Sequence, residues 1–64
     1  MWIVYTEVIT DGGYERWFYG KYESRRKANE VASHQNDLFR NSDAFFCVAN
    51  EDDRIIDTIN NYRR

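Results

Sequence analysis

Cysteine, histidine and proline are scarce in this sequence, and each scarcity excludes a class of protein. Cys47 is the single cysteine, so the chain cannot form an internal disulfide. One cysteine and one histidine, His34, cannot supply the roughly four ligands that structural zinc requires. Proline is absent and glycine is rare, so nothing in the composition indicates a linker or a disordered tail. We expect no metal and no other cofactor.

Long apolar runs are also missing. No segment approaches the roughly 20 apolar residues that span a bilayer. Thr6 and Glu7 interrupt the apolar start of the chain, so it does not form the core of a signal peptide. A single free cysteine, here within the apolar run 45–48 and most simply a small buried residue, is typical of a reducing compartment. We therefore expect a cytoplasmic protein without a membrane partner.

Catalytic groups cannot be assembled from the residues present. His34 has only Glu30 and Leu38 as neighbours one helical turn away, and a general base needs a nucleophile or an orienting group. The acidic cluster 51–53 with Asp57 lacks the spacing of a calcium loop and suits a solvated turn that leads into a helix. The sequence thus predicts a protein that is not an enzyme.

The chain has 64 residues, of which 17% are aromatic, and a net charge of −2. A domain this short buries only about 60% of the surface that its unfolded chain exposes, so it usually needs help to be stable. With disulfides and metals excluded, oligomerisation is the remaining aid. The acidic balance removes the simplest argument for nucleic-acid binding.

The order of residue patterns predicts one small α+β domain over residues 1–64, of the type ββαβ with a tail. Residues 2–10 and 14–22 are rich in β-branched and aromatic types, and Asp11-Gly12-Gly13 supplies a tight turn between them. This is an antiparallel hairpin. Gly20 interrupts its second strand and indicates a bulge or a close backbone approach.

Ser24 is a suitable N-cap for an amphipathic helix over residues 25–40 that backs the hairpin. Its apolar positions follow the helical period and predict one buried face, with Gln35 in a gap of the stripe; they are Ala28, Val31, Ala32, Leu38 and Phe39. Residues 44–50 predict a short buried strand. In the tail, 53–62, a short helix capped by Asp53 is our first choice, and a strand over 54–60 is the alternative.

Strand alternation places large apolar side chains on both faces of the hairpin, grouping Phe18 with Tyr22 and Trp17 with Tyr19. One helix covers only one face of a small sheet. The other face must be covered by the tail, by a second subunit or by a different protein. The residues that we expect in a protein-binding or dimer surface are Trp2, Tyr5, Trp17 and Tyr19, with Arg25, Arg26 and Lys27 as a charged rim.

The basic turn 25–27 opposes the helix dipole, which a partner's carboxylates or phosphates could offset. The alternative is a solvated turn that Glu23 and Glu30 partly neutralise.

The stretch 18–32, in which a hairpin runs into a capped helix, is similar to a pattern of small proteins from bacteriophages and mobile elements. That resemblance covers about a quarter of the chain. It implies a viral protein that binds and blocks a host protein, such as a component of antiviral defence, in the host cell cytoplasm. We therefore expect a non-enzymatic protein-interaction module, an inhibitor of a host factor, that acts as a homodimer.

The same stretch also resembles the arm-type DNA-binding domain of tyrosine recombinases. In that family a small sheet reads the major groove and a helix backs the sheet. The resemblance implies DNA contacts from Arg16, Tyr19, Lys21 and Arg25. The chain departs from the family in its acidic balance and its two-stranded start. A small DNA-binding domain, which would also use Arg26 and Lys27, is the alternative function.

Overall fold

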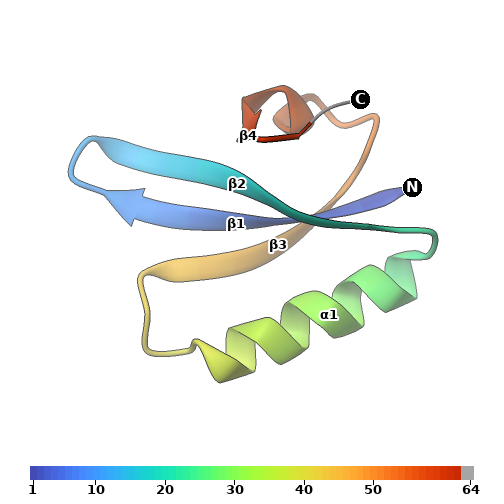
Figure 1. Cartoon of the computed structure of the whole chain (residues 1–64), viewed down its shortest axis with the longest axis horizontal. Coiled ribbons are helices and arrows are strands. Elements are labelled where there is room, and N and C mark those ends of the chain that lie inside the picture. The colour runs from blue at the N-terminus through green and yellow to red at the C-terminus, as the bar shows by residue number, and fades with distance from the viewer. Residues whose placement is uncertain (63–64) are drawn as a thin grey trace.

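A four-stranded sheet lies at the centre of the chain, in the strand order β3-β1-β2-β4 (Figure 1). The computed structural model describes residues 1–62. The strands are β1 (Trp2–Thr10), β2 (Gly13–Tyr22), β3 (Ala44–Asn50) and β4 (Ile59–Asn60), and the helix α1 (Arg25–Leu38) follows β2. The α+β class and the ββαβ order predicted from the sequence are confirmed.

The hairpin forms because the turn residues allow it. β1 pairs antiparallel with β2 from Trp2↔Tyr22 to Thr10↔Gly13. Gly13 has a φ of 132°, a conformation open to glycine and strained for other residues. β2 begins at this glycine, one residue earlier than predicted. β1 also pairs antiparallel with β3, and it is therefore the central strand between two partners.

β2 contains a bulge at Tyr19. Val4 pairs with Gly20 but Tyr5 pairs with Phe18, so Tyr19 is an extra residue without a cross-strand partner. The close approach predicted at Gly20 is present too, because a Cβ there would lie 2.7 Å from the Tyr22 hydroxyl oxygen. The bulge reverses the alternation, so Tyr22 shares the face of Val4 and Phe18 shares the opposite face. The predicted grouping of Phe18 with Tyr22 is wrong for this reason.

α1 begins as predicted and ends two residues early. The Ser24 side chain accepts a hydrogen bond from the Lys27 amide at 3.0 Å, which caps the helix. At the other end Phe39 leaves the helical conformation, with φ −113° and ψ 28°, although its amide still donates to the Gln35 carbonyl. The amide and hydroxyl of Ser42 both donate to the Phe39 carbonyl, and this turn ends the helix.

The first half of α1 packs on the sheet through small side chains. Ala28 and Ala32 are buried against Val4 of the central strand. The prediction that the whole stripe is buried is wrong at its C-terminal end, where Leu38 is 59% and Phe39 is 50% exposed. α1 lies mainly over β3 and β1 and makes fewer contacts with β2, so the flank of the helix that faces β2 is the less covered one.

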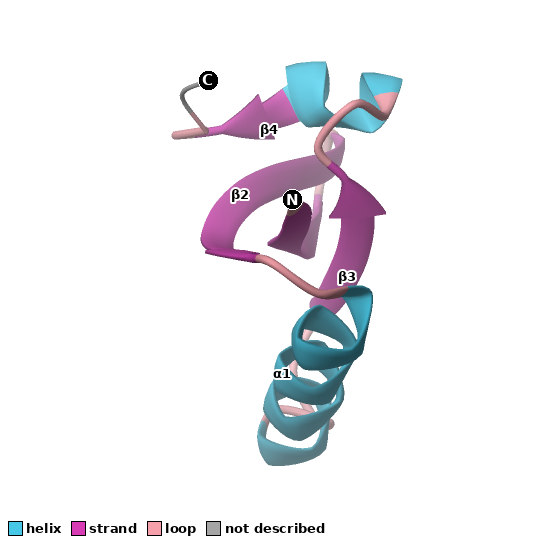
Figure 2. Cartoon of the chain, turned by 90° about the vertical axis from the view of Figure 1, so that its right-hand side faces the viewer, coloured by secondary structure: helices cyan, strands magenta, loops and turns pink. Residues whose placement is uncertain are grey.

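The tail covers the opposite face of the sheet (Figure 2). A short 3-10 helix, η1 (Arg54–Thr58), is capped by Asp53 and followed by β4, which pairs parallel with β2. The predicted tail helix and its strand alternative thus each describe part of the segment. Ile56 and Ile59 are 2% and 7% exposed and form a second core with Ile3 and Tyr5. Of the three covers considered for this face, the tail is the one observed over these residues.

Candidate protein-binding surface

Exposed apolar side chains gather at one end of the molecule, which we call the turn end. It holds the β1–β2 turn, the C-terminus of α1 and the start of β3, and it lies at the left of Figure 1, away from the N-terminus. Among the described residues, every large apolar side chain that is exposed, apart from Met1, belongs to this end; these are Ile9, Tyr14, Trp17, Tyr19, Leu38, Phe39 and Phe45. Apolar side chains concentrated in this way commonly mark an interaction site.

Five of the side chains at the turn end lie on the helix side of the sheet, and ring contacts join three of them. Phe46 lies at its centre: the Tyr19 ring meets it edge-on, with the ring centroids 5.1 Å apart, and the Phe39 centroid lies at 6.2 Å. Trp17 is on the same face of β2 as Tyr19 and is 40% exposed. We call this set, Trp17, Tyr19, Leu38, Phe39 and Phe46, the aromatic surface.

The rotation of α1 about its axis explains why this surface stays open. Asn36 donates to the Phe46 carbonyl at 2.9 Å and accepts from the Phe46 amide at 2.7 Å, which fixes one flank of the helix to β3. Successive helical residues are about 100° apart, so Leu38 lies about 200° around the helix from Asn36. Leu38 is therefore on the flank turned away from the β3 edge, toward the side of Trp17 and Tyr19.

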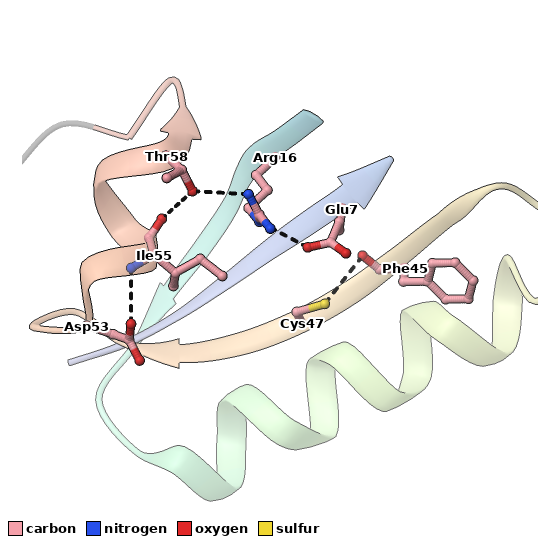
Figure 3. A network of polar contacts seen from close by, with 7 residues as sticks. All are labelled: Glu7, Arg16, Phe45, Cys47, Asp53, Ile55 and Thr58. Carbon is pink, nitrogen blue, oxygen red and sulfur yellow. Dashed lines mark hydrogen bonds and ion pairs between the residues drawn. The ribbon is translucent and has the colours of Figure 1, made fainter. Parts of the chain in front are cut away.

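The other face of the turn end is organised around an ion pair (Figure 3). The Arg16 guanidinium binds the Glu7 carboxylate at 3.0 Å and donates to the Thr58 hydroxyl at 3.4 Å. Thr58 in turn donates to the carbonyl of Ile55 at 2.6 Å, so the chain of contacts ties β2 to η1. Arg16 is thereby engaged within the fold.

The structure divides the predicted site residues into three groups. Trp17 and Tyr19 belong to the aromatic surface. Tyr5 is only 5% exposed, and its assignment to a contact surface is wrong because η1 and β4 cover its face of β1. Trp2 is half-buried beside α1, and the Arg25 guanidinium carbon lies 5.4 Å from the centre of its ring.

The basic turn does not border the aromatic surface. Arg25, Arg26 and Lys27 are exposed at the start of α1, beside Trp2. Trp2 pairs with Tyr22, whereas Trp17 pairs with Thr6, four residues or about 13 Å further along β1. Arg26 forms an exposed pair with Glu30 at 3.6 Å, in line with the partial neutralisation considered above. The structure thus places the expected charged rim beside Trp2, away from Trp17, and its role in binding stays a prediction.

Leu38, Phe39 and Phe46 are members of the surface that sequence reasoning missed. Their periodicity and apolar character assigned them to the core. A signal was present for two of them, because Leu38 and Phe39 come at the very end of the helical stripe, next to the polar residues 40–43. A sheet covers the side chains at the end of a helical stripe less completely than those at its middle.

The pKa shifts of the titratable groups on the tail side of the sheet follow from their burial in the fold. Burial, and then the neighbouring Cys47 and Glu7, raise the pKa of Tyr5 to about 12. Burial also raises the pKa of the Cys47 thiol, which lowers the thiolate fraction needed for nucleophilic chemistry. At the other end of the sheet, hydrogen bonds from the Met1 amino group and from Lys21 lower the pKa of Glu51.

The raised pKa of Tyr5 predicts a loss of stability at alkaline pH. The unfolded chain ionises this phenol near pH 10 and the folded chain near pH 12, so its contribution is full below pH 10 and is lost as the pH rises toward 12. We expect Tyr5→Phe to reduce this loss, measured by chemical denaturation across that range. Part of the loss should remain, because the pKa of Lys21 is raised by its hydrogen bond to Glu51. An unchanged alkaline profile in Tyr5→Phe would contradict the burial of this hydroxyl.

No protein-family model, curated protein or solved structure matches the chain. Within residues 1–62, no three His, Cys, Asp or Glu side chains are grouped in a way that could hold a metal ion. In the same part of the chain, no helix has the length and hydropathy required to cross a membrane.

Proposed function

We propose that this chain is a non-enzymatic module that binds another protein through the aromatic surface. One observation carries the proposal: Tyr19 of β2 and Phe39 at the end of α1 pack on Phe46 of β3, and four of the five members of the aromatic surface are 40% to 59% exposed. Tyr and Trp carry much of the binding energy at protein interfaces. Aromatic rings that are already packed together can form the centre of an interface without rearranging on binding.

The proposal extends to the biological role that the phage-type hairpin and helix imply. The module would bind and inhibit a host protein, such as a component of antiviral defence, in the cytoplasm of the host cell. The single unpaired Cys47 supports a reducing compartment. A second copy of this chain is the competing occupant of the same surface, and sedimentation at micromolar concentration, with Tyr19→Ser as the comparison, tests for the resulting homodimer.

DNA binding is the weaker proposal, because ion pairs within the fold engage two of its four expected contacts. Arg16 is paired with Glu7, and the Lys21 ammonium lies 3.1 Å from Glu51. The sheet face opposite the helix, which the recombinase resemblance would turn toward the major groove, carries η1 and β4. Titration with duplex DNA at low salt tests this alternative, and affinity that falls steeply with added salt would support it.

The binding proposal is tested with substitutions on the two sides of the turn end. Phe39→Ser removes a 50% exposed ring from the aromatic surface, and Phe45→Ser removes a 51% exposed ring from the other face. The wild type and each variant are immobilised separately and exposed to a bacterial lysate. The proteins that each one captures are quantified by mass spectrometry. We expect proteins whose capture falls at least about tenfold in Phe39→Ser and persists in Phe45→Ser. If Phe39→Ser captures every protein as well as the wild type does, the proposal is contradicted.

A further inference from the structure

We infer that the aromatic surface takes a polypeptide segment that is apolar at its centre and flanked by Lys or Arg. This inference rests on the proposed function and names the chemistry of the partner. Its basis is the charge around the surface, which is negative on more than one side.

Glu15 is an acidic group in direct contact with one of the aromatic rings. It pairs with Val8 on β1, and it therefore shares the face of Trp17. The Trp17 indole nitrogen donates to its carboxylate at 3.4 Å, so an anionic group lies at the border of the exposed ring. A cation placed there would meet the carboxylate and the face of an indole ring together, and both attract positive charge.

The rest of the turn end repeats this sign. Asp37 directly precedes Leu38, Asp43 directly precedes β3, and Asp11 lies in the β1–β2 turn. Arg40 is 3.8 Å from Asp37, and both side chains are about three quarters exposed, so water screens this pair strongly. The other guanidinium of this end, that of Arg16, lies on the opposite face and binds Glu7.

Among residues 1–62, the turn end thus carries five carboxylates, including Glu7, and two guanidinium groups. Such a surface steers cationic partners toward itself and repels acidic ones. The same charges disfavour a second copy of this chain as the occupant. In a twofold dimer each surface meets itself, so two patches of the same negative charge would be brought together.

Selection from a random peptide display library tests the chemistry without assuming a partner. The full chain is the bait, and each enriched peptide is measured again on Phe39→Ser. We expect enriched peptides with aromatic or Leu residues between Lys or Arg residues, binding that weakens as salt is raised, and at least a tenfold loss on Phe39→Ser. Glu15→Lys should weaken the same peptides severalfold, whereas Glu23→Lys, an exposed site beside α1's start, should leave them unchanged.

The outcomes separate this inference from the proposal beneath it. Neutral or acidic peptides that still depend on Phe39 overturn the cationic partner and leave the aromatic surface as a binding site. Peptides indifferent to Phe39→Ser count against both. An absence of enrichment overturns the inference, as does a dimer at micromolar concentration that Tyr19→Ser disperses, since the second copy is then the occupant.

Discussion

Replacing Ile56 with alanine is expected to lower the free energy of unfolding by about 2–5 kcal/mol, the usual loss for a buried Ile truncated to Ala. Ile56 is 2% exposed and packs with Ile3 and Tyr5 between η1 and the sheet. A chain of this size has a small margin of stability, so the thermal midpoint should fall by on the order of 10 °C or more. Denaturant and thermal unfolding followed by circular dichroism measure both quantities.

Ile9→Ala is the matched control, because it makes the same change in a side chain that is 49% exposed at the turn end. It removes little buried area, and the weaker β propensity of alanine should cost at most about 1 kcal/mol. Equal losses in the two variants would mean that the tail does not cover the sheet in solution. The face of Tyr5 would then be open, and the tail could not be the cover that this fold requires.

The hairpin and the helix could be predicted because local chemistry determines them. Gly13 supplies the positive φ that the turn needs, and Ser24 supplies the cap that α1 needs. The tail was ambiguous for a physical reason. Ile55, Ile56 and Ile59 suit one turn of helix and also an extended strand, and the structure uses a short piece of each.

The candidate site could be predicted only in part, because it depends on where elements end in space. Periodicity showed that Leu38 and Phe39 share the stripe of Ala28, but it carries no information on how far the sheet extends beneath α1. Gly20 indicated a bulge or a close approach, and only the observed bulge, which falls between Phe18 and Tyr22, puts these two side chains on opposite faces. Trp17 and Tyr19 were found from sequence because residues two apart in a strand share a face, and the bulge at Tyr19 does not separate them.

Replacing Asn36 with alanine should both destabilise the domain and expose backbone hydrogen-bonding groups on the outer edge of β3. The Asn36 amide makes two hydrogen bonds to the backbone of Phe46, at 2.9 Å and 2.7 Å, in a partly buried position. Their loss leaves a backbone N–H and C=O without partners, at a cost of about 1–3 kcal/mol. We expect a lower denaturation midpoint and, at high concentration, self-association detected by sedimentation.

The self-association follows from the place of β3 in the sheet. β3 is an outer strand, and its odd-numbered residues bond to β1, as the bonds from Ile9 to Asp43 and from Glu51 to Met1 show at its two ends. Even-numbered residues of β3 therefore direct their N–H and C=O groups outward, where Ser42 bonds to those of Ala44 and the Asp53 amide bonds to the Asn50 carbonyl. Outward groups that are left open between these ends pair readily with another strand. Asn36 occupies these groups at Phe46, in the middle of the edge.

Asn29→Ala is the control for Asn36→Ala, since it makes the same change at an exposed position of the same helix. It should raise stability by a few tenths of a kcal/mol through the better helix propensity of alanine. Asn36→Asp separates the two bonds, because a carboxylate still accepts from the Phe46 amide but donates nothing to the carbonyl. We expect Asn36→Asp to fall between the wild type and Asn36→Ala. If Asn36→Ala remains monomeric and behaves like Asn29→Ala, the side chain does not close this edge.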